Sequence, residues 1–93
     1  MSETPLPYAG REVLTLRQID RLNGVPKGTG FRAFKRVRDD LVEGRDFFRL
    51  DGSEYAGYIE SLRRQGLVYE STIHLLLLTR EAYDRMSAHD AWL

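Results

Sequence analysis

The first third of the chain alternates apolar and polar positions at helical spacing, bounded by residues typical of helix ends. Thr15 and Gln18 have the spacing of a capping box, in which a hydroxyl and an amide satisfy free N–H groups at a helix start. Asn23 and Gly24 tolerate the left-handed conformation that ends many helices. Between these signals, three apolar residues share one face: Leu16, Ile19 and Leu22. The pattern predicts a short first helix from Thr15 to Asn23.

A second helix is predicted from about Thr29 to Leu41, after a turn rich in Pro and Gly over residues 25–30. Its apolar stripe comprises Phe31, Phe34, Val37 and Leu41. Two short helices joined by a tight turn that contains glycine form a helix-turn-helix unit. The second of them would be the recognition helix.

The second half of the chain predicts shorter elements. Residues 46–50 have the pattern of a short strand, and a third helix begins at Asp51, where Asp51 and Glu54 have capping-box spacing. Residues 67–69 and 72–78 are expected to form a hairpin, although the leucine run 75–78 could instead be helical. Thr79 would cap a last helix, and Trp92 and Leu93 are expected to fold back onto the body.

These elements predict an α+β fold, namely a small winged-helix-like domain with the order α, α, β, α, β, β, α. Residues 1–12, with Pro5 and Pro7, are expected to form an extended arm, and residues 13–93 a single domain. The expected core comprises Leu16, Ile19, Leu22, Phe31, Phe34, Val37, Leu41, Phe48, Ile59, Leu62, Leu75 and Leu77.

Composition narrows the class of protein. The 93 residues include no cysteine, which excludes disulfides, thiolate zinc sites and cysteine nucleophiles. The N-terminus lacks the basic and apolar pattern of a secretory signal, and no apolar run approaches the roughly 20 residues of a membrane span. We therefore expect a soluble cytoplasmic protein without a membrane partner.

The net charge is zero, but the charges are unevenly distributed along the chain. Residues 27–38 carry five cations and no acid, and a local basic face on a neutral body is typical of a compact nucleic-acid reader. A solvated helix face is the alternative that charge alone leaves open. The residues expected to contact DNA are Lys27, Thr29, Arg32, Lys35, Arg36 and Arg38. Arg32 and Arg36 could reach guanine, whereas Lys27, Lys35 and Arg38 suit phosphates.

Candidate catalytic groups form no recognisable site. His74 lies in an apolar run and His89 near the C-terminus, and neither has a second ligand at metal-binding spacing. Three acids, Asp39, Asp40 and Glu43, could hold a divalent ion in a small nuclease, but pairing with nearby arginines explains them more simply. We expect no enzymatic activity, no cofactor and no metal.

Several motifs resemble the N-terminal module of phage antirepressors known as the ORF-six N-terminal domain, a relative of the KilA-N and Bro-N domains. They are Val13-Leu14-Thr15, Phe34-Lys35-Arg36, the stretch 43–50 (EGRDFFRL) and Thr79-Arg80-Glu81-Ala82. The resemblance covers residues 13–86 and implies DNA binding in phage and prophage regulation, without a reaction. Ala82 stands where glycine is common in the family, and Val37 departs from the pattern by standing where the family usually has Asn. Antirepressors also usually carry a further C-terminal effector domain, so the chain is either a free-standing regulator or part of a longer protein.

The leading hypothesis is therefore a transcription regulator that binds specific double-stranded DNA, as a homodimer on a two-part site. The alternative is a protein-interaction module, such as an antirepressor or inhibitor that binds a repressor or host protein. The neutral charge, the acidic second half of the chain and the tyrosines Tyr8, Tyr55, Tyr58, Tyr69 and Tyr83 favour this alternative.

Overall fold

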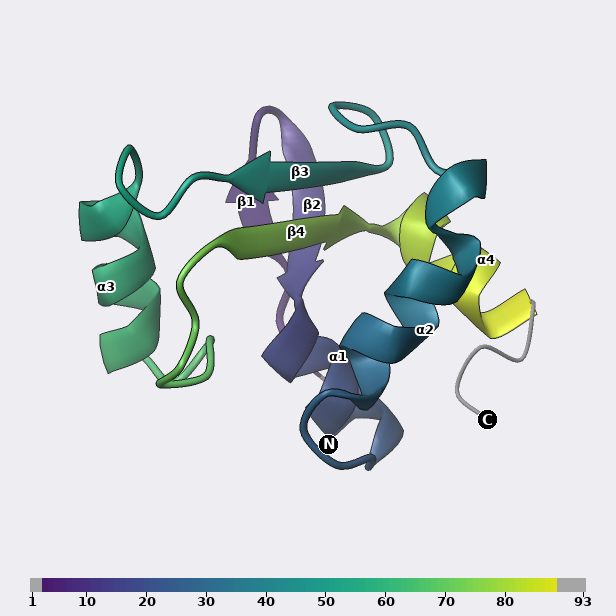
Figure 1. Ribbon diagram of the computed structural model, residues 1–93, viewed down its shortest axis with the longest axis horizontal. Helices are drawn as coiled ribbons and strands as arrows, with labels where there is room; N and C mark the ends of the chain where they lie inside the picture. Colours follow the sequence, from purple (N-terminus) through teal and green to yellow (C-terminus); the bar gives the residue numbers. More distant parts are fainter. Residues whose placement is uncertain (1–2, 89–93) are drawn as a thin grey trace.

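The computed structural model describes residues 3–88 and has an α+β fold in which helices lie at both ends of one small sheet (Figure 1). In chain order the elements are β1 (Leu6–Tyr8), β2 (Arg11–Thr15), α1 (Leu16–Asn23), α2 (Thr29–Val37), the 3-10 helix η1 (Arg38–Asp40), β3 (Phe47–Leu50), α3 (Ala56–Arg64), β4 (Leu75–Thr79) and α4 (Arg80–Ala88). The four strands pair antiparallel in the order β1-β2-β4-β3.

The leucine run is the central strand of this sheet. β4 pairs with β2 through Val13 opposite Thr79, and with β3 through Phe47 opposite Leu78. Successive side chains of a strand point to opposite faces. Leu78 therefore belongs to one core and Leu77 to the other. Burial on both faces explains why this strand reads as a continuous apolar run.

One core joins α1, α2 and α4 to the sheet. Phe34 of α2 packs edge-to-face against Phe47 of β3, with ring centroids 5.0 Å apart. Ala82 and Met86 of α4 and Ile19 of α1 are fully buried in the same cluster. This core holds α2 by one side only, and it leaves the other side in solvent.

The second core joins α3 to the opposite face of the sheet. Ile59 and Leu62 of α3 lie in one cluster with Leu50, Leu75 and other buried residues of β2, β3 and β4. The segment expected to be an arm closes this side, because residues 6–8 form the edge strand β1. Its Tyr8 ring packs edge-to-face against Phe48, with centroids 5.1 Å apart.

The first predicted helix is confirmed in detail. Thr15 caps α1, its hydroxyl accepts a hydrogen bond from the Gln18 N–H, and the Gln18 amide closes the capping box. Gly24 ends the helix in the left-handed region with φ of 63°. The hydroxyl of Thr79 likewise accepts a hydrogen bond from the Ala82 N–H at the start of α4.

The second helix exists, but two predictions about it are wrong. It ends at Val37 and continues as a 3-10 turn, η1, before Leu41. Phe31 is 41% exposed and does not belong to the core, because the buried stripe runs through Gly30, Ala33 and Phe34 instead. The two small residues let α2 lie close to α1, which turns Phe31 outward.

The predicted hairpin over 67–78 is also wrong. Residues 67–69 form no strand, and β4 pairs with β2 and β3 instead. The carbonyl of Leu67 accepts a hydrogen bond from the Thr15 hydroxyl at 2.5 Å, so a side chain contacts the backbone group that strand pairing would have used.

α3 begins at Ala56 and not at Asp51 as predicted. The Asp51 carboxylate instead caps a turn by accepting hydrogen bonds from the Ser53 and Glu54 N–H groups.

Three residues of the expected core are only half-buried, namely Leu16, Leu22 and Phe48. Phe47 rather than Phe48 is fully buried between the sheet and the helices. Trp92, Leu93 and His89 lie outside the residues that the structure describes.

Replacing Phe34 by alanine should lower the free energy of unfolding by about 3–5 kcal/mol, as large-to-small aromatic changes in cores do. Phe31→Ala is the matched control on the same helix and should cost clearly less, because this side chain is 41% exposed. Urea denaturation of both variants measures this contrast. Equal costs for the two variants would show that α2 is rotated from the orientation described above.

Candidate nucleic-acid interface

The turn between α1 and α2 is fixed by the carboxylate of Asp20, which is 2% exposed. Its oxygens accept hydrogen bonds from the backbone N–H groups of Gly28, at 3.2 Å, and Gly30, at 2.7 Å. The first N–H groups of a helix have no partner within the helix and favour a negative charge. Asp20 of the first helix therefore serves as the N-terminal partner of the second.

Gly30 is required by this contact. A Cβ at position 30 would lie 2.7 Å from an oxygen of the Asp20 carboxylate. The side chain of Ile19 lies next to it, at 3.4 Å from the same point. The absence of a side chain thus lets the start of α2 approach α1 closely enough for the carboxylate to reach both N–H groups.

The loop 67–72 is tied to the same turn by side chains. The Tyr69 hydroxyl donates a hydrogen bond to the Asp20 carboxylate, and Arg17 donates to the carbonyl of Val68 at 3.2 Å. Lys27 donates to the Ser71 hydroxyl at 2.8 Å, and its ammonium lies 5.1 Å from the centroid of the Tyr69 ring. These contacts join α1, the turn and the loop into one unit.

Burial, with the hydrogen bond to the neighbouring Asp20 carboxylate, raises the pKa of Tyr69 well above its ordinary value. The folded protein therefore favours the neutral phenol. The hydrogen bond of the neutral Tyr69 phenol therefore contributes fully to the free energy of unfolding below the unfolded-state pKa of about 10. Its contribution declines as the pH rises toward the folded-state pKa.

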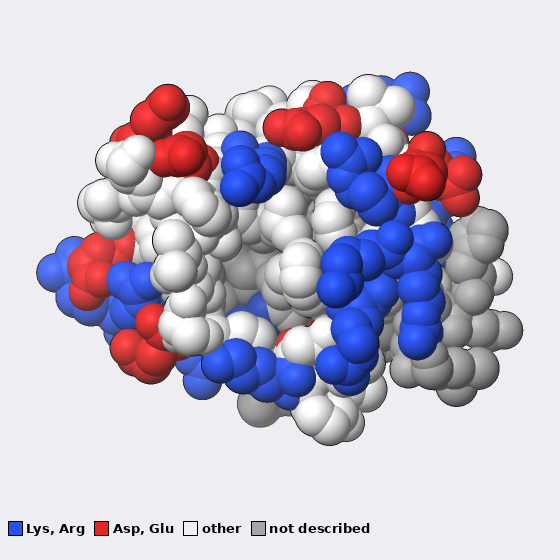
Figure 2. Space-filling view, in the orientation of Figure 1, with Lys and Arg blue, Asp and Glu red and all other residues white. Residues whose placement is uncertain are grey.

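The outer face of α2 is cationic. Its exposed residues are Phe31, Arg32, Lys35 and Arg36, and the other five residues of the helix are buried. Figure 2 shows blue side chains gathered over α2, with uncharged side chains beside them. The helix thus presents three cations on one side while its opposite side is held by the core.

The other residues expected to contact DNA have different positions. Thr29 is 8% exposed, so it does not lie on the outer face, and its hydroxyl accepts a hydrogen bond from Arg32 at 3.4 Å. Lys27 lies on the turn before α2. Arg38 lies in η1, with its guanidinium 4.6 Å from the Phe47 ring centroid and 4.0 Å from Glu43. Arg32, Lys35 and Arg36 are the predicted residues that the structure brings together on α2.

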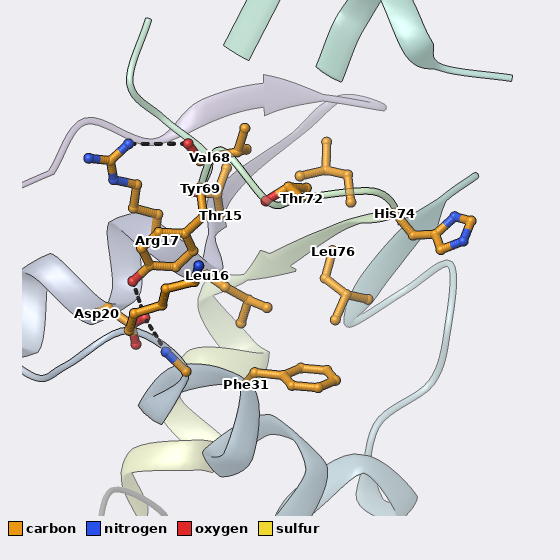
Figure 3. Close-up of a pocket in the computed structure, with 13 residues that line it drawn as sticks. Thr15, Leu16, Arg17, Asp20, Phe31, Val68, Tyr69, Thr72, His74 and Leu76 are labelled. Carbon is orange, nitrogen blue, oxygen red and sulfur yellow. Dashed lines mark hydrogen bonds between the residues drawn. The ribbon is translucent and has the colours of Figure 1, made fainter. Parts of the chain in front are cut away.

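A groove of about 190 Å³ lies between α2 and the loop that leads into β4 (Figure 3). Leu16, Phe31 and Leu76 line it with apolar surface, and Tyr69 and Thr72 line it from the loop. Sequence reasoning missed both this groove and the role of Asp20. The role of Asp20 has no signal in the sequence, because the burial of its carboxylate is a property of the folded structure.

The acidic residues provide no metal site in residues 3–88, where no group of three or more histidine or acidic side chains is placed to hold an ion. Asp39, Asp40 and Glu43 do not converge. His74 is exposed, and its Nδ1 accepts a hydrogen bond from the Gly52 N–H at 3.1 Å. Over the same residues, the helices are too short or too polar to cross a membrane.

In comparisons with known proteins, no protein-family model, curated protein or solved structure matches this chain.

Tyr69→Phe should lower the free energy of unfolding by about 1.5–3 kcal/mol at neutral pH, the range for a hydrogen bond to a charged group. The difference between wild type and variant should shrink above about pH 10, because only the wild-type unfolded state then gains from ionising this phenol. Urea denaturation at a series of pH values measures both effects. A difference that stays constant from pH 8 to 11 would contradict the contact with Asp20.

Gly30→Ala should cost about 1–3 kcal/mol, as overpacking in well-packed regions does, because the new methyl group displaces the Asp20 carboxylate. Gly57→Ala in α3 is the matched control, since a Cβ there meets no atom within 4 Å. Thermal unfolding of the two variants should show a lower melting temperature only for Gly30→Ala. A melting temperature unchanged by Gly30→Ala would contradict the close approach of α1 and α2.

Proposed function

We propose that this protein binds double-stranded DNA in a sequence-specific manner, through the outer face of α2. The observation that carries the proposal is the division of this helix into two sides. Three of its four exposed residues are cations, while Gly30, Ala33, Phe34 and Val37 are buried. A helix held by its core side with cations projecting outward has the form that a major groove admits.

The proposal assigns different roles to the cations. Arg32 and Arg36 lie one helical turn apart, so both guanidiniums can reach base edges, where arginine forms paired hydrogen bonds with guanine. Lys35 lies between Phe31 and Arg32 on the helical wheel and would contact a phosphate. Lys27 and Arg38, at the two ends of α2, would also contact phosphates. Arg38 would exchange its long contact with Glu43 for the DNA backbone.

The arrangement of the other elements is compatible with a winged helix-turn-helix. α1 and α2 are joined by a tight turn, and β3 and β4 pair antiparallel after α2, as wing strands do, with α3 inserted between them. The resemblance to the ORF-six N-terminal domain supports a role in phage or prophage transcription regulation. We extend the proposal to a cytoplasmic regulator that binds a two-part site as a homodimer.

The competing function is a module that binds a repressor or host protein. The groove beside α2 supports it, because a concave surface with an apolar lining is suited to an apolar side chain of a partner. A salt-titrated binding assay against a genomic DNA pool separates the two functions. DNA binding by several phosphate contacts gives a steep fall in affinity with salt, whereas a protein module retains no DNA at moderate salt.

Arg36→Ala should lose about 1–3 kcal/mol of binding free energy on the preferred site and relax the preference at one base position, as loss of an arginine–guanine contact does. Lys35→Ala should weaken binding to all sequences alike and lower the salt slope by about one unit. Titrations with the preferred duplex and a scrambled duplex, at several salt concentrations, measure both effects.

Arg64→Ala, which removes an exposed cation of α3, is the control and should leave affinity and salt slope near wild type. If Arg36→Ala and Lys35→Ala both bind DNA as tightly as wild type, the face of α2 is merely solvated. The protein-interaction function then replaces DNA binding.

A further inference from the structure

Phe31 is an apolar side chain on the cationic face of α2. Each other exposed position of this helix carries Arg or Lys, and the remaining apolar side chains of the helix are buried. Phe31 lies in the first turn, directly before Arg32, and it is 41% exposed. Leaving an aromatic ring in water forfeits hydrophobic free energy. The core therefore does not explain why a phenylalanine stands here.

The surroundings of the ring leave part of it available. The Lys35 ammonium lies 4.7 Å from the ring centroid. Elsewhere the ring borders the groove, together with Leu16 and Leu76. In Figure 3 the side chain extends from α2 below Leu76. Phe31 thus presents apolar surface beside the cations that would contact DNA.

Helix geometry places Phe31 within reach of the bases if α2 binds as proposed. At about 100° per residue, Phe31, Lys35, Arg32 and Arg36 follow one another around an arc of about 140°. Residues near the N-terminus of a recognition helix contact base edges. Phe31 and Arg32 occupy that turn, so an apolar group and a guanidinium would face the base pairs together.

We propose that Phe31 contacts the 5-methyl group of a thymine, next to a guanine bound by Arg32. This inference rests on the DNA-binding function proposed above and names part of the sequence that is read. In the major groove, thymine differs from the other bases by the apolar surface of its C5-methyl group. Phenylalanine is among the side chains that contact this methyl group. The preferred site should therefore contain a thymine close to a guanine that Arg32 binds.

Replacing single thymines by deoxyuridine in the preferred duplex tests the inference, because the change removes the methyl group and leaves base pairing intact. Wild type should lose about fourfold in affinity at one thymine position, the value of one buried methyl group. Phe31→Ala should bind the thymine and deoxyuridine duplexes equally. Phe31→Leu, which keeps an apolar group, should retain part of the discrimination.

Ile73→Ala is the matched control, because it removes a 71% exposed apolar side chain outside α2 and should keep the fourfold discrimination. If the Phe31 ring only supports the Lys35 side chain, Phe31→Ala should weaken binding to both duplexes equally. The ratio of the two affinities would then stay fourfold. That result overturns the inference. The inference is also overturned if the wild-type protein binds every deoxyuridine duplex as tightly as the thymine duplex. In both of these cases the proposed DNA-binding function stands. If the wild-type protein binds neither the thymine nor the deoxyuridine duplex, the proposed function is refuted as well.

Discussion

The position of α2 depends on one buried carboxylate. Asp20 lies in the last turn of α1, yet its oxygens accept hydrogen bonds from the N–H groups of Gly28 and Gly30 and from the Tyr69 hydroxyl. A buried charge is costly unless it is fully hydrogen-bonded. Three donors from two other segments meet that requirement. The carboxylate therefore specifies the angle between α1 and α2 and holds the loop 67–72 against both.

The consequence of this arrangement is a helix whose outer side points away from the core. The core on the inner side of α2, built around Phe34 and Phe47, and the Asp20 contacts at its start fix the orientation of the helix. Arg32, Lys35 and Arg36 are not needed for the fold's hydrophobic contacts. Arg32, Lys35 and the ring of Phe31 consequently project from a rigid support, which lowers the entropic cost of binding a ligand.

Local signals predicted the fold well where structure is decided within a few residues. The capping box at Thr15, the left-handed Gly24 and the cap at Thr79 each involve groups within four residues of one another. The sequence pattern failed where distant segments compete. Residues 67–69 have a strand-like composition, but the Thr15 and Arg17 side chains, some 50 residues earlier, bind their carbonyls.

For the candidate site, the sequence predicted the cations of α2 but not the orientation of the helix. Its cations could be found from charge and helical spacing, whereas the rotation of α2 depends on Gly30 lying against Asp20, a tertiary contact without a local signal. The predicted orientation of α2 about its own axis therefore placed Phe31 in the core, where the structure has Gly30 and Ala33. It also placed Thr29 on the outer face, where the structure buries it.

Backbone and side-chain NMR shifts of the labelled protein, recorded during titration with its preferred duplex, test the central claim most directly. The account predicts shift changes concentrated in residues 27–38, including the Phe31 ring and the guanidinium groups of Arg32 and Arg36. The amides of α3 should stay unchanged. Shift changes centred on α3 or β1, with α2 unaffected, would contradict the account.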